Sequence, residues 1–283
     1  PLSTWKTMLG YSVDVVTTSW IESNYSGQDL PEKIRNFLID EYVPRLLEYV
    51  LLVGDITDIP MRHCYPDPTN HGDDEDYCPP TDYYYADLNG NWDSDGDGYF
   101  GEYGQDSVDF IPELYVGRIP YSDSATVWEI CEKLVNFEKD CGVWKNYALL
   151  LGAISNYANE DGQDPYPRTD GASLMENIIS DIAIGAHTTM YEKEGLDSCT
   201  VPCDYSLNNS NVVNVWSTGR FGMVNWWAHG SIYSAWRKVW SADTNNNGIP
   251  ESDEMDWYYF ITTTDATSLD DEHPSIVFAC SCN

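Results

Sequence analysis

Thiol and imidazole side chains follow two apolar segments in the second half of the chain. His229 and Gly230 come directly after one such segment, and Cys280 and Cys282 end another. A thiolate becomes an effective nucleophile where an imidazole takes its proton, and a nearby backbone amide can stabilise the oxyanion that then forms. A glycine after the histidine lets such an amide approach a substrate closely. These residue types indicate nucleophilic catalysis, although a structural histidine and an inert or disulfide-bonded cysteine fit the same spacing.

A twelve-residue segment, 243–254, has the spacing of an EF-hand calcium loop. Oxygen-bearing side chains stand at loop positions 1, 3 and 5, a glycine at position 6 and a glutamate at position 12. The glycine permits the turn, the carbonyl at position 7 can bind the ion, and the glutamate can bind it with both oxygens. The alternative is a polar loop that is merely rich in Asp and Asn. The predicted ligands are Asp243, Asn245, Asn247, Ile249 and Glu254.

A second acidic segment, 93–99, repeats the pattern at positions 1, 3, 5 and 6. Three carboxylates on one tight turn repel one another unless a cation lies between them. Position 12 is Gly104, so the match is incomplete, and Asp106 or Asp109 could replace Glu102 in closing the shell. Because neither segment lies between paired amphipathic helices, as a calcium sensor requires, we predict two structural Ca²⁺ sites. The ligands predicted here are Asp93, Asp95, Asp97, Tyr99 and Glu102.

Charge and composition exclude several classes of protein. The 283-residue chain carries 47 acidic and 14 basic side chains, and the resulting charge of −33 repels nucleic-acid phosphates and anionic membranes. No apolar stretch reaches the roughly 18 residues that a membrane span needs. With 42% hydrophobic residues, the chain is expected to fold as one large domain or two packed sub-domains.

The cysteines indicate an oxidising compartment. The eight cysteines form near pairs along the sequence, and three local disulfides would leave the last pair free for chemistry. Glycosylation sequons at Asn24 and Asn208 are compatible with secretion. We therefore expect a processed protein that is secreted or held at the cell surface. The near pairs that could form these bridges are Cys64 and Cys78, Cys131 and Cys141, and Cys199 and Cys203, although spacing alone does not fix their connectivity.

The secondary-structure pattern indicates an α/β fold. Short β-branched or aromatic runs alternate with amphipathic stretches, which is typical of a largely parallel sheet with helical crossovers. In such sheets function collects where loops leave the carboxyl ends of strands. Three of these ends can converge here: the loop after Ile154, the turn at His229, and the loop at Cys280. The expected strands are 11–18, 49–55, 83–86, 114–119, 147–154, 188–192, 221–228 and 274–281, and the expected helices are 30–48, 124–140 and 172–184.

The order of these motifs resembles the gingipain family of caspase-like cysteine peptidases over nearly the whole chain. The matching segments are collinear with that family, and they include the turn 229–231 and the terminal cysteine strand. The remaining matching segments are Pro1-Leu2, Trp5-Lys6, 10–13, 49–55, Ile59-Pro60, 81–86 and 112–118.

The resemblance implies a caspase/gingipain-like fold of two side-by-side α/β sub-domains with largely parallel sheets flanked by helices. The first, 1–121, carries the acidic calcium-loop insertion, and the second, 122–283, carries a catalytic Cys and His dyad. It implies a cysteine endopeptidase that hydrolyses protein or peptide substrates. Together with the cysteine pattern and the two acidic loops, it predicts a secreted peptidase that is stabilised by structural calcium. The alternative is an inactive, calcium-binding extracellular structural or interaction protein with the same fold. A further segment or chain of the same precursor is a candidate partner.

The family motif also assigns individual residues. It makes His229 the base and the Gly230 backbone amide part of the oxyanion hole. For the nucleophile it favours Cys282, counted from Phe278 to the asparagine that follows, with Cys280 as the alternative because a small residue precedes it. For two further family positions the candidates are weaker: Glu160 as the acidic third catalytic residue, and Asp170 as the acid that contacts a basic substrate side chain.

Overall fold

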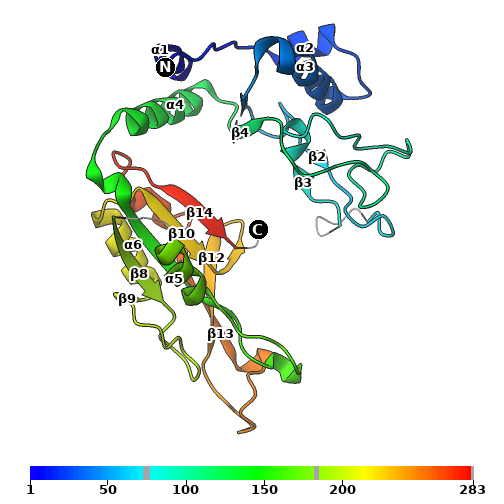
Figure 1. Ribbon diagram of the computed structural model, residues 1–283. Coiled ribbons are helices and arrows are strands. Elements are labelled where there is room, and N and C mark those ends of the chain that lie inside the picture. The colour runs from blue at the N-terminus through cyan, green and yellow to red at the C-terminus, as the bar shows by residue number, and fades with distance from the viewer. Residues whose placement is uncertain (73–76, 182–184, 282–283) are drawn as a thin grey trace. The chain divides into compact units, whose positions relative to one another are not determined.

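The structure, a computed structural model, describes residues 1–72, 77–181 and 185–281 (Figure 1). The chain divides into two compact units, Pro1–Val135 and Asn136–Asn283. The division falls inside helix α4 (Ser124–Lys139), whereas the sequence analysis placed the boundary ahead of that helix.

The first unit is built around helix α3 (Leu30–Arg45) and a parallel pair of strands. The Asp29 carboxylate accepts the amide of Glu32 at 3.0 Å and caps the helix, and Pro31 stands in the first turn, where its missing N–H costs nothing. The core contains Ile34, Leu38, Leu52, Tyr85 and Leu114. The other elements are α1 (Leu2–Met8), α2 (Thr18–Asn24), β1 (Tyr49–Val53), β2 (Arg62–His63), β3 (Pro80–Thr81), η1 (Tyr83–Tyr85) and β4 (Tyr115–Ile119); β1 pairs with β4 in parallel, and β2 pairs with β3 in antiparallel orientation.

Two of the predicted strands in this unit are wrong. Residues 11–17 form no regular element and are exposed, because no neighbouring strand pairs with them among the described residues. Residues 83–85 form a turn of 3₁₀ helix, in which the Tyr85 amide donates to the Asp82 carbonyl at 3.0 Å. The Thr81 hydroxyl also accepts the Tyr83 amide at 3.0 Å, so polar groups before the tyrosines begin a turn where an aromatic run predicted a strand.

The second unit contains a five-stranded parallel sheet in the order β14-β10-β5-β8-β9. Both faces of the central strand β5 are covered, which explains its continuous apolar sequence. Leu149 and Leu151 pack against one cluster that includes Trp216 of helix α6, and Leu150 packs with Met175 of helix α5 on the other face. The elements are β5 (Tyr147–Gly152), α5 (Gly171–Asp181), β8 (Ala186–Tyr191), β9 (Tyr205–Ser206), α6 (Asn209–Thr218), β10 (Met223–Trp227) and β14 (Ile276–Cys280).

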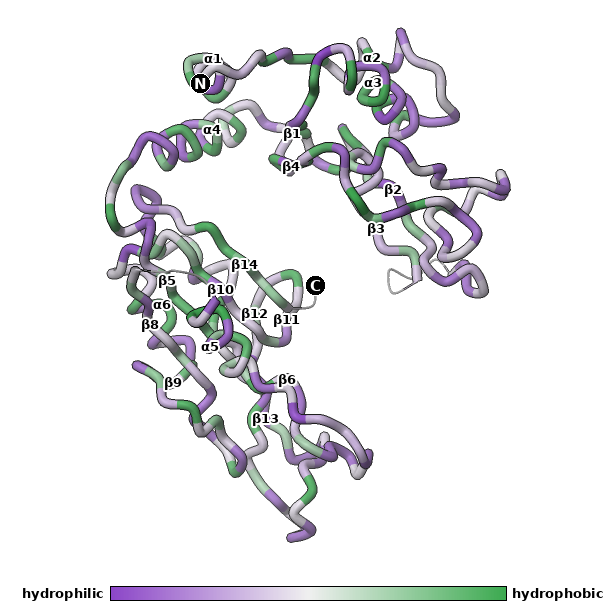
Figure 2. The backbone as a smooth tube through the Cα atoms, viewed as in Figure 1, coloured by the Kyte–Doolittle hydropathy of each residue, from purple (hydrophilic) through white to green (hydrophobic). Residues whose placement is uncertain are grey.

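This sheet confirms the α/β prediction. The expected strands 188–192, 221–228 and 274–281 correspond to β8, β10 and β14, and the expected strand 147–154 divides into β5 and a short strand, β6. The expected helix 172–184 is observed up to Asp181, and residues 182–184 lie outside the described part of the chain. Strand β14 is hydrophobic throughout (Figure 2), and its five residues are exposed at the edge of the sheet.

A smaller antiparallel sheet extends from the carboxyl end of β10. Strand β11 (His229–Ser231) pairs with β12 (Ser234–Trp240), and β12 pairs with β13 (Met255–Thr262), which leaves β13 at the edge. A bulge interrupts the register between Ala235 and Trp236. The hydrophilic loop that predicts the second calcium site joins β12 to β13. Strand β6 (Ile154–Asn156) pairs separately with β7 (Thr169–Asp170).

Candidate active site

The imidazole of His229 is held in a defined orientation. His229 begins β11, one residue after β10 ends, and its Nε2 atom lies 2.9 Å from the Ser155 carbonyl oxygen. Because a carbonyl only accepts hydrogen bonds, Nε2 must carry the hydrogen in the neutral ring, and Nδ1 is then the nitrogen with a free lone pair. The structure thus presents Nδ1 of His229 as the basic atom.

A thiol lies on the neighbouring strand end. Strand β14 runs parallel to β10 with Cys280 in register with Trp227, and the Ala228 amide donates to the Cys280 carbonyl at 3.1 Å. Cys280 is exposed. Because His229 is the residue after Ala228, it lies next to the backbone that pairs with Cys280, and the two strand ends are adjacent. Cys282, the nucleophile favoured by the family motif, lies outside the described residues.

Two groups that touch His229 were missed by the sequence analysis. The first is the Ser155 carbonyl of β6, which carries no side-chain signal because any residue supplies the same atom. The second is Trp257 of β13, whose ring meets the His229 ring edge to face with centroids 4.8 Å apart. The sequence shows an aromatic run at 257–259, but only the pairing of the strands brings Trp257 to the histidine.

Glu160 is bound to a lysine. Its two carboxylate oxygens lie 2.7 and 2.8 Å from Nζ of Lys238, and one of them also accepts the Tyr157 amide at 3.0 Å. Lys238 is only 4% exposed, so this is a largely buried ion pair. His229 takes its orientation from the Ser155 carbonyl, and Glu160 serves as the counter-ion of Lys238.

Asp170 lies close to the strand ends but is already engaged. One of its oxygens accepts the Ala172 amide at 3.0 Å at the start of α5, and the other lies 3.1 Å from the Arg168 guanidinium. Arg168 also pairs with Asp197. Burial alone would lower the pKa of Arg168, but the two carboxylates outweigh burial and raise this pKa. A basic substrate group would have to compete with Arg168 for Asp170.

The first acidic loop brings three predicted calcium ligands together. Oxygens of Asp93, Asp95 and Asp97 lie within 4.8 Å of one another. Glu102 is turned toward His71: one of its oxygens bonds to Nε2 of that residue at 2.7 Å, and the other has no hydrogen-bond partner among the described residues. The ring of Tyr99 stacks on His71 with centroids 3.7 Å apart. The three aspartates fit a hard cation, whereas Glu102 and the ring of Tyr99 contact His71 instead.

The second loop shows side-chain to backbone bonds that close a tight turn. Asp243 accepts the Asn247 and Gly248 amides at 3.1 and 3.0 Å, and the side-chain oxygen of Asn247 accepts the Ile249 amide at 2.7 Å. The side-chain oxygen of Asn245 accepts the same Asn247 amide at 2.9 Å.

The last predicted ligand of this loop, Glu254, has both oxygens occupied. One accepts the Thr244 amide at 2.5 Å, and the other accepts Nε1 of Trp240 at 3.0 Å. Burial would raise the pKa of Glu254, but these bonds outweigh it and hold the pKa below its usual value. Glu254 would have to exchange these bonds to bind an ion at position 12.

The predicted disulfides are not formed in the structure. The residues that are free thiols include Cys64, Cys131, Cys141, Cys199 and Cys203, at least one from each predicted pair. Burial raises the pKa of the Cys64 and Cys199 thiols, which makes both poor nucleophiles. The bridges remain predictions for the protein in an oxidising compartment.

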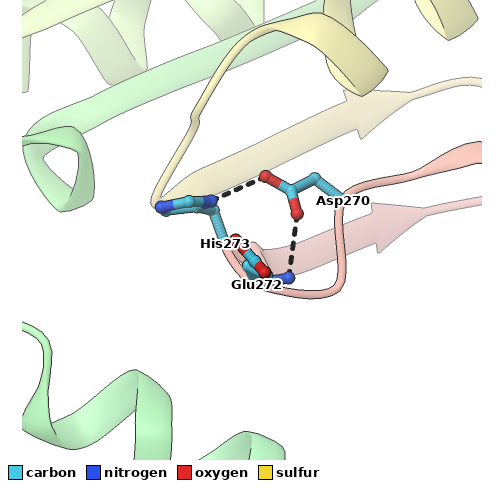
Figure 3. A group of neighbouring side chains, drawn as sticks. All are labelled: Asp270, Glu272 and His273. Atoms are coloured by element: carbon cyan, nitrogen blue, oxygen red, sulfur yellow. Dashed lines mark hydrogen bonds and ion pairs between the residues drawn. The ribbon is translucent and has the colours of Figure 1, made fainter.

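A further group of possible metal ligands precedes β14 (Figure 3). Ligand atoms of Asp270, Glu272 and His273 lie within 4.8 Å of one another. One Asp270 oxygen lies 2.6 Å from Nδ1 of His273, and the other accepts the Glu272 amide at 2.9 Å. The His273 ring also packs edge to face on Trp144 at 5.2 Å. These contacts shape the loop that leads into β14.

Comparisons with known proteins identify the family. The model of Peptidase family C25 matches residues 1–283, and the chain belongs to this family. No curated protein sequence matches the chain. None of the described helices is both long enough and apolar enough to cross a membrane.

Solved gingipain structures share the fold. The crystal structure of gingipain R (RgpB), an Arg-specific cysteine proteinase, superposes with a TM-score of 0.63 at 16% identity over 99% of this chain and 50% of that chain. The complex of the pro- and mature domains of Porphyromonas gingivalis RgpB gives a TM-score of 0.63 at 16% identity over 99% of this chain and 52% of that chain. The chain thus spans about half the length of these solved chains. The predicted gingipain resemblance and fold are confirmed.

Proposed function

We propose that this chain is the core of a cysteine endopeptidase in which His229 activates a thiol at the end of β14. The observation that carries the proposal is the 2.9 Å bond from Nε2 of His229 to the Ser155 carbonyl. This bond orients the imidazole and leaves Nδ1 free to accept a proton, and the backbone pairing of Ala228 with Cys280 makes the two strand ends neighbours. Membership of a peptidase family supports the same activity.

The proposed reaction uses the chain's own groups. The thiol proton moves to Nδ1 of His229, and the thiolate sulfur attacks the carbonyl carbon of the scissile peptide bond. The carbonyl electron pair moves to the oxygen, where the backbone amides of Gly230 and the nucleophilic cysteine would stabilise the negative charge. The imidazolium then gives its proton to the leaving amine, and water hydrolyses the thioester that remains.

The two candidate nucleophiles are Cys282, which the family motif favours, and Cys280, which ends β14. A thiol-directed peptide inhibitor should label the wild-type protein once per molecule. Cys282→Ala should abolish the labelling, whereas Cys280→Ala should retain it, and the reverse pattern would make Cys280 the nucleophile. Loss of labelling in His229→Ala, with an unchanged melting temperature, would support the base. If the folded wild-type protein showed neither labelling nor peptide cleavage, the proposal would fail and an inactive interaction protein would replace it.

We further propose that calcium stabilises the two acidic loops and takes no part in the reaction. The convergence of Asp93, Asp95 and Asp97 supports the first site, and the EF-hand spacing of 243–254 supports the second. Isothermal titration calorimetry with CaCl₂, on protein from which a chelator has first removed bound metal, should show two binding events. Secretion, which the cysteine count and sequons favour, is tested by locating the protein in cell fractions of its source.

A further inference from the structure

Three consecutive aromatic side chains on β13 are exposed beside the candidate base. Trp257, Tyr258 and Tyr259 are 47%, 43% and 48% exposed. They lie on the edge strand of the small sheet, and Trp257 contacts the ring of His229. Large aromatic side chains dominate the energetics of interfaces when they become covered. Neighbouring strand residues point to opposite faces, so Trp257 and Tyr259 share one face of β13 and Tyr258 points to the other. The face of Trp257 and Tyr259 therefore adjoins the proposed active site through Trp257.

The same residues line an open hollow of about 430 Å³. This volume falls within the range of small-ligand and side-chain pockets, roughly 300–1,000 Å³. The wall includes Trp236, whose ring meets Tyr259 edge to face with centroids 5.9 Å apart, and polar residues at the start of α6. We name the surface formed by Trp236, Trp257 and Tyr259 the aromatic hollow; Arg237 and Tyr258 line its rim.

Charge in the aromatic hollow is already compensated. Arg237 lines it, but its guanidinium lies 2.8 Å from the buried Glu192 carboxylate and 2.6 Å from the Glu194 carboxylate. Its plane also lies over the Tyr258 ring, with the central carbon 4.9 Å from the ring centroid. An incoming cation or anion would find its opposite charge already paired. The chemistry of the wall instead favours an uncharged aromatic or apolar side chain.

We infer that the aromatic hollow is a substrate subsite that holds an aromatic side chain of an extended polypeptide whose scissile bond lies at His229. The inference rests on the proposed function and adds a specificity to it. The edge position of β13 suits an extended chain, because the backbone of an edge strand is the surface on which a peptide can add as a further strand. Trp257 joins the hollow to the base, and Tyr259 lies in the same cross-strand row as Trp236 and His229.

The test separates binding from turnover. A dye-labelled peptide with one phenylalanine, moved through the positions on either side of the scissile bond, is compared with its all-alanine counterpart. Affinity is measured by fluorescence anisotropy on the Cys280→Ala/Cys282→Ala protein, which retains the hollow and cannot cleave. We expect phenylalanine at one position to tighten binding about tenfold, the size expected for one aromatic contact with burial of its ring.

Tyr259→Ala in the same background should abolish that preference, and Trp257→Ala should do likewise. Tyr147→Ala is the matched control, because Tyr147 is an equally exposed aromatic, 40%, at the opposite end of the parallel sheet. If phenylalanine gave no preference at any position, or if the preference survived in Tyr259→Ala, the inference would be overturned. Labelling of the wild-type thiol by iodoacetamide is measured separately, so failure of the proposed dyad is distinguishable from failure of the subsite.

Discussion

Replacing Glu160 with glutamine separates two roles that an acidic residue near His229 could have. In the structure its carboxylate is the partner of the Lys238 ammonium at 2.7 and 2.8 Å, and Lys238 is 4% exposed. Removing one charge of a buried pair leaves the other uncompensated and costs about 3–5 kcal/mol. For a unit of this size each kcal/mol shifts the melting temperature by roughly 2–4 °C, so we expect Glu160→Gln to melt about 10 °C lower.

The same variant should leave the reactivity of the thiol unchanged. His229 is oriented by the Ser155 carbonyl, so the rate of iodoacetamide alkylation, measured well below the melting transition, should match that of the wild type. The double variant Glu160→Gln/Lys238→Met removes the unpaired ammonium and should recover most of the lost stability, as differential scanning calorimetry can show. An alkylation rate more than tenfold lower, with an unchanged melting temperature, would refute this reasoning and make Glu160 a partner of the base.

Three further predictions concern the rest of the chain. The Asp29→Asn variant loses the ion pair with Arg62 and keeps the helix cap. Burial would raise the pKa of Asp29, but the bonds from Arg62 outweigh burial and hold this pKa below its usual value. The ion pair therefore stabilises the folded protein above about pH 4, and this stabilisation is lost as the pH falls through the lowered pKa. The melting-temperature gap to the wild type should therefore be constant above about pH 5 and should narrow as the pH falls below about pH 4, and a gap that did not narrow would contradict it. Millimolar CaCl₂ should raise the melting temperature, because an ion at a hundredfold excess over its dissociation constant stabilises the folded protein by about 3 kcal/mol. The Asp95→Ala variant should gain less than the wild type. An identical gain in the two proteins would exclude the first loop as a site. In Gly171→Ala the added methyl group would lie 2.8 Å from the Ala153 carbonyl oxygen, which is too close. Urea unfolding should therefore show a free energy of unfolding that is lower by about 1–3 kcal/mol, and an unchanged free energy would disprove this prediction.

Local sequence signals predicted four strands of the parallel sheet and helix α5, but they did not predict helix α6 or the small antiparallel sheet. The run at β5 is apolar at every position because both its faces are covered, and such runs are visible without knowledge of their neighbours. Helix α3 was equally visible, because a capping aspartate and a proline in the first turn mark its start. The signals failed at residues 11–17 and 83–85, where a β-like composition was not matched by a neighbouring strand or was overridden by turn-forming side chains.

The sequence by itself determined which side chains could do chemistry: a histidine followed by glycine, thiols at a strand end, and carboxylates at calcium-loop spacing. Only the tertiary structure decided how they are used. It placed a backbone carbonyl of Ser155 on Nε2 of His229, gave Glu160 to Lys238, and brought Trp257 against the imidazole. These partners lie 74, 78 and 28 residues apart along the chain, respectively. Local patterns cannot specify such pairs, because a carbonyl is common to every residue and the pairing depends on which strands become neighbours.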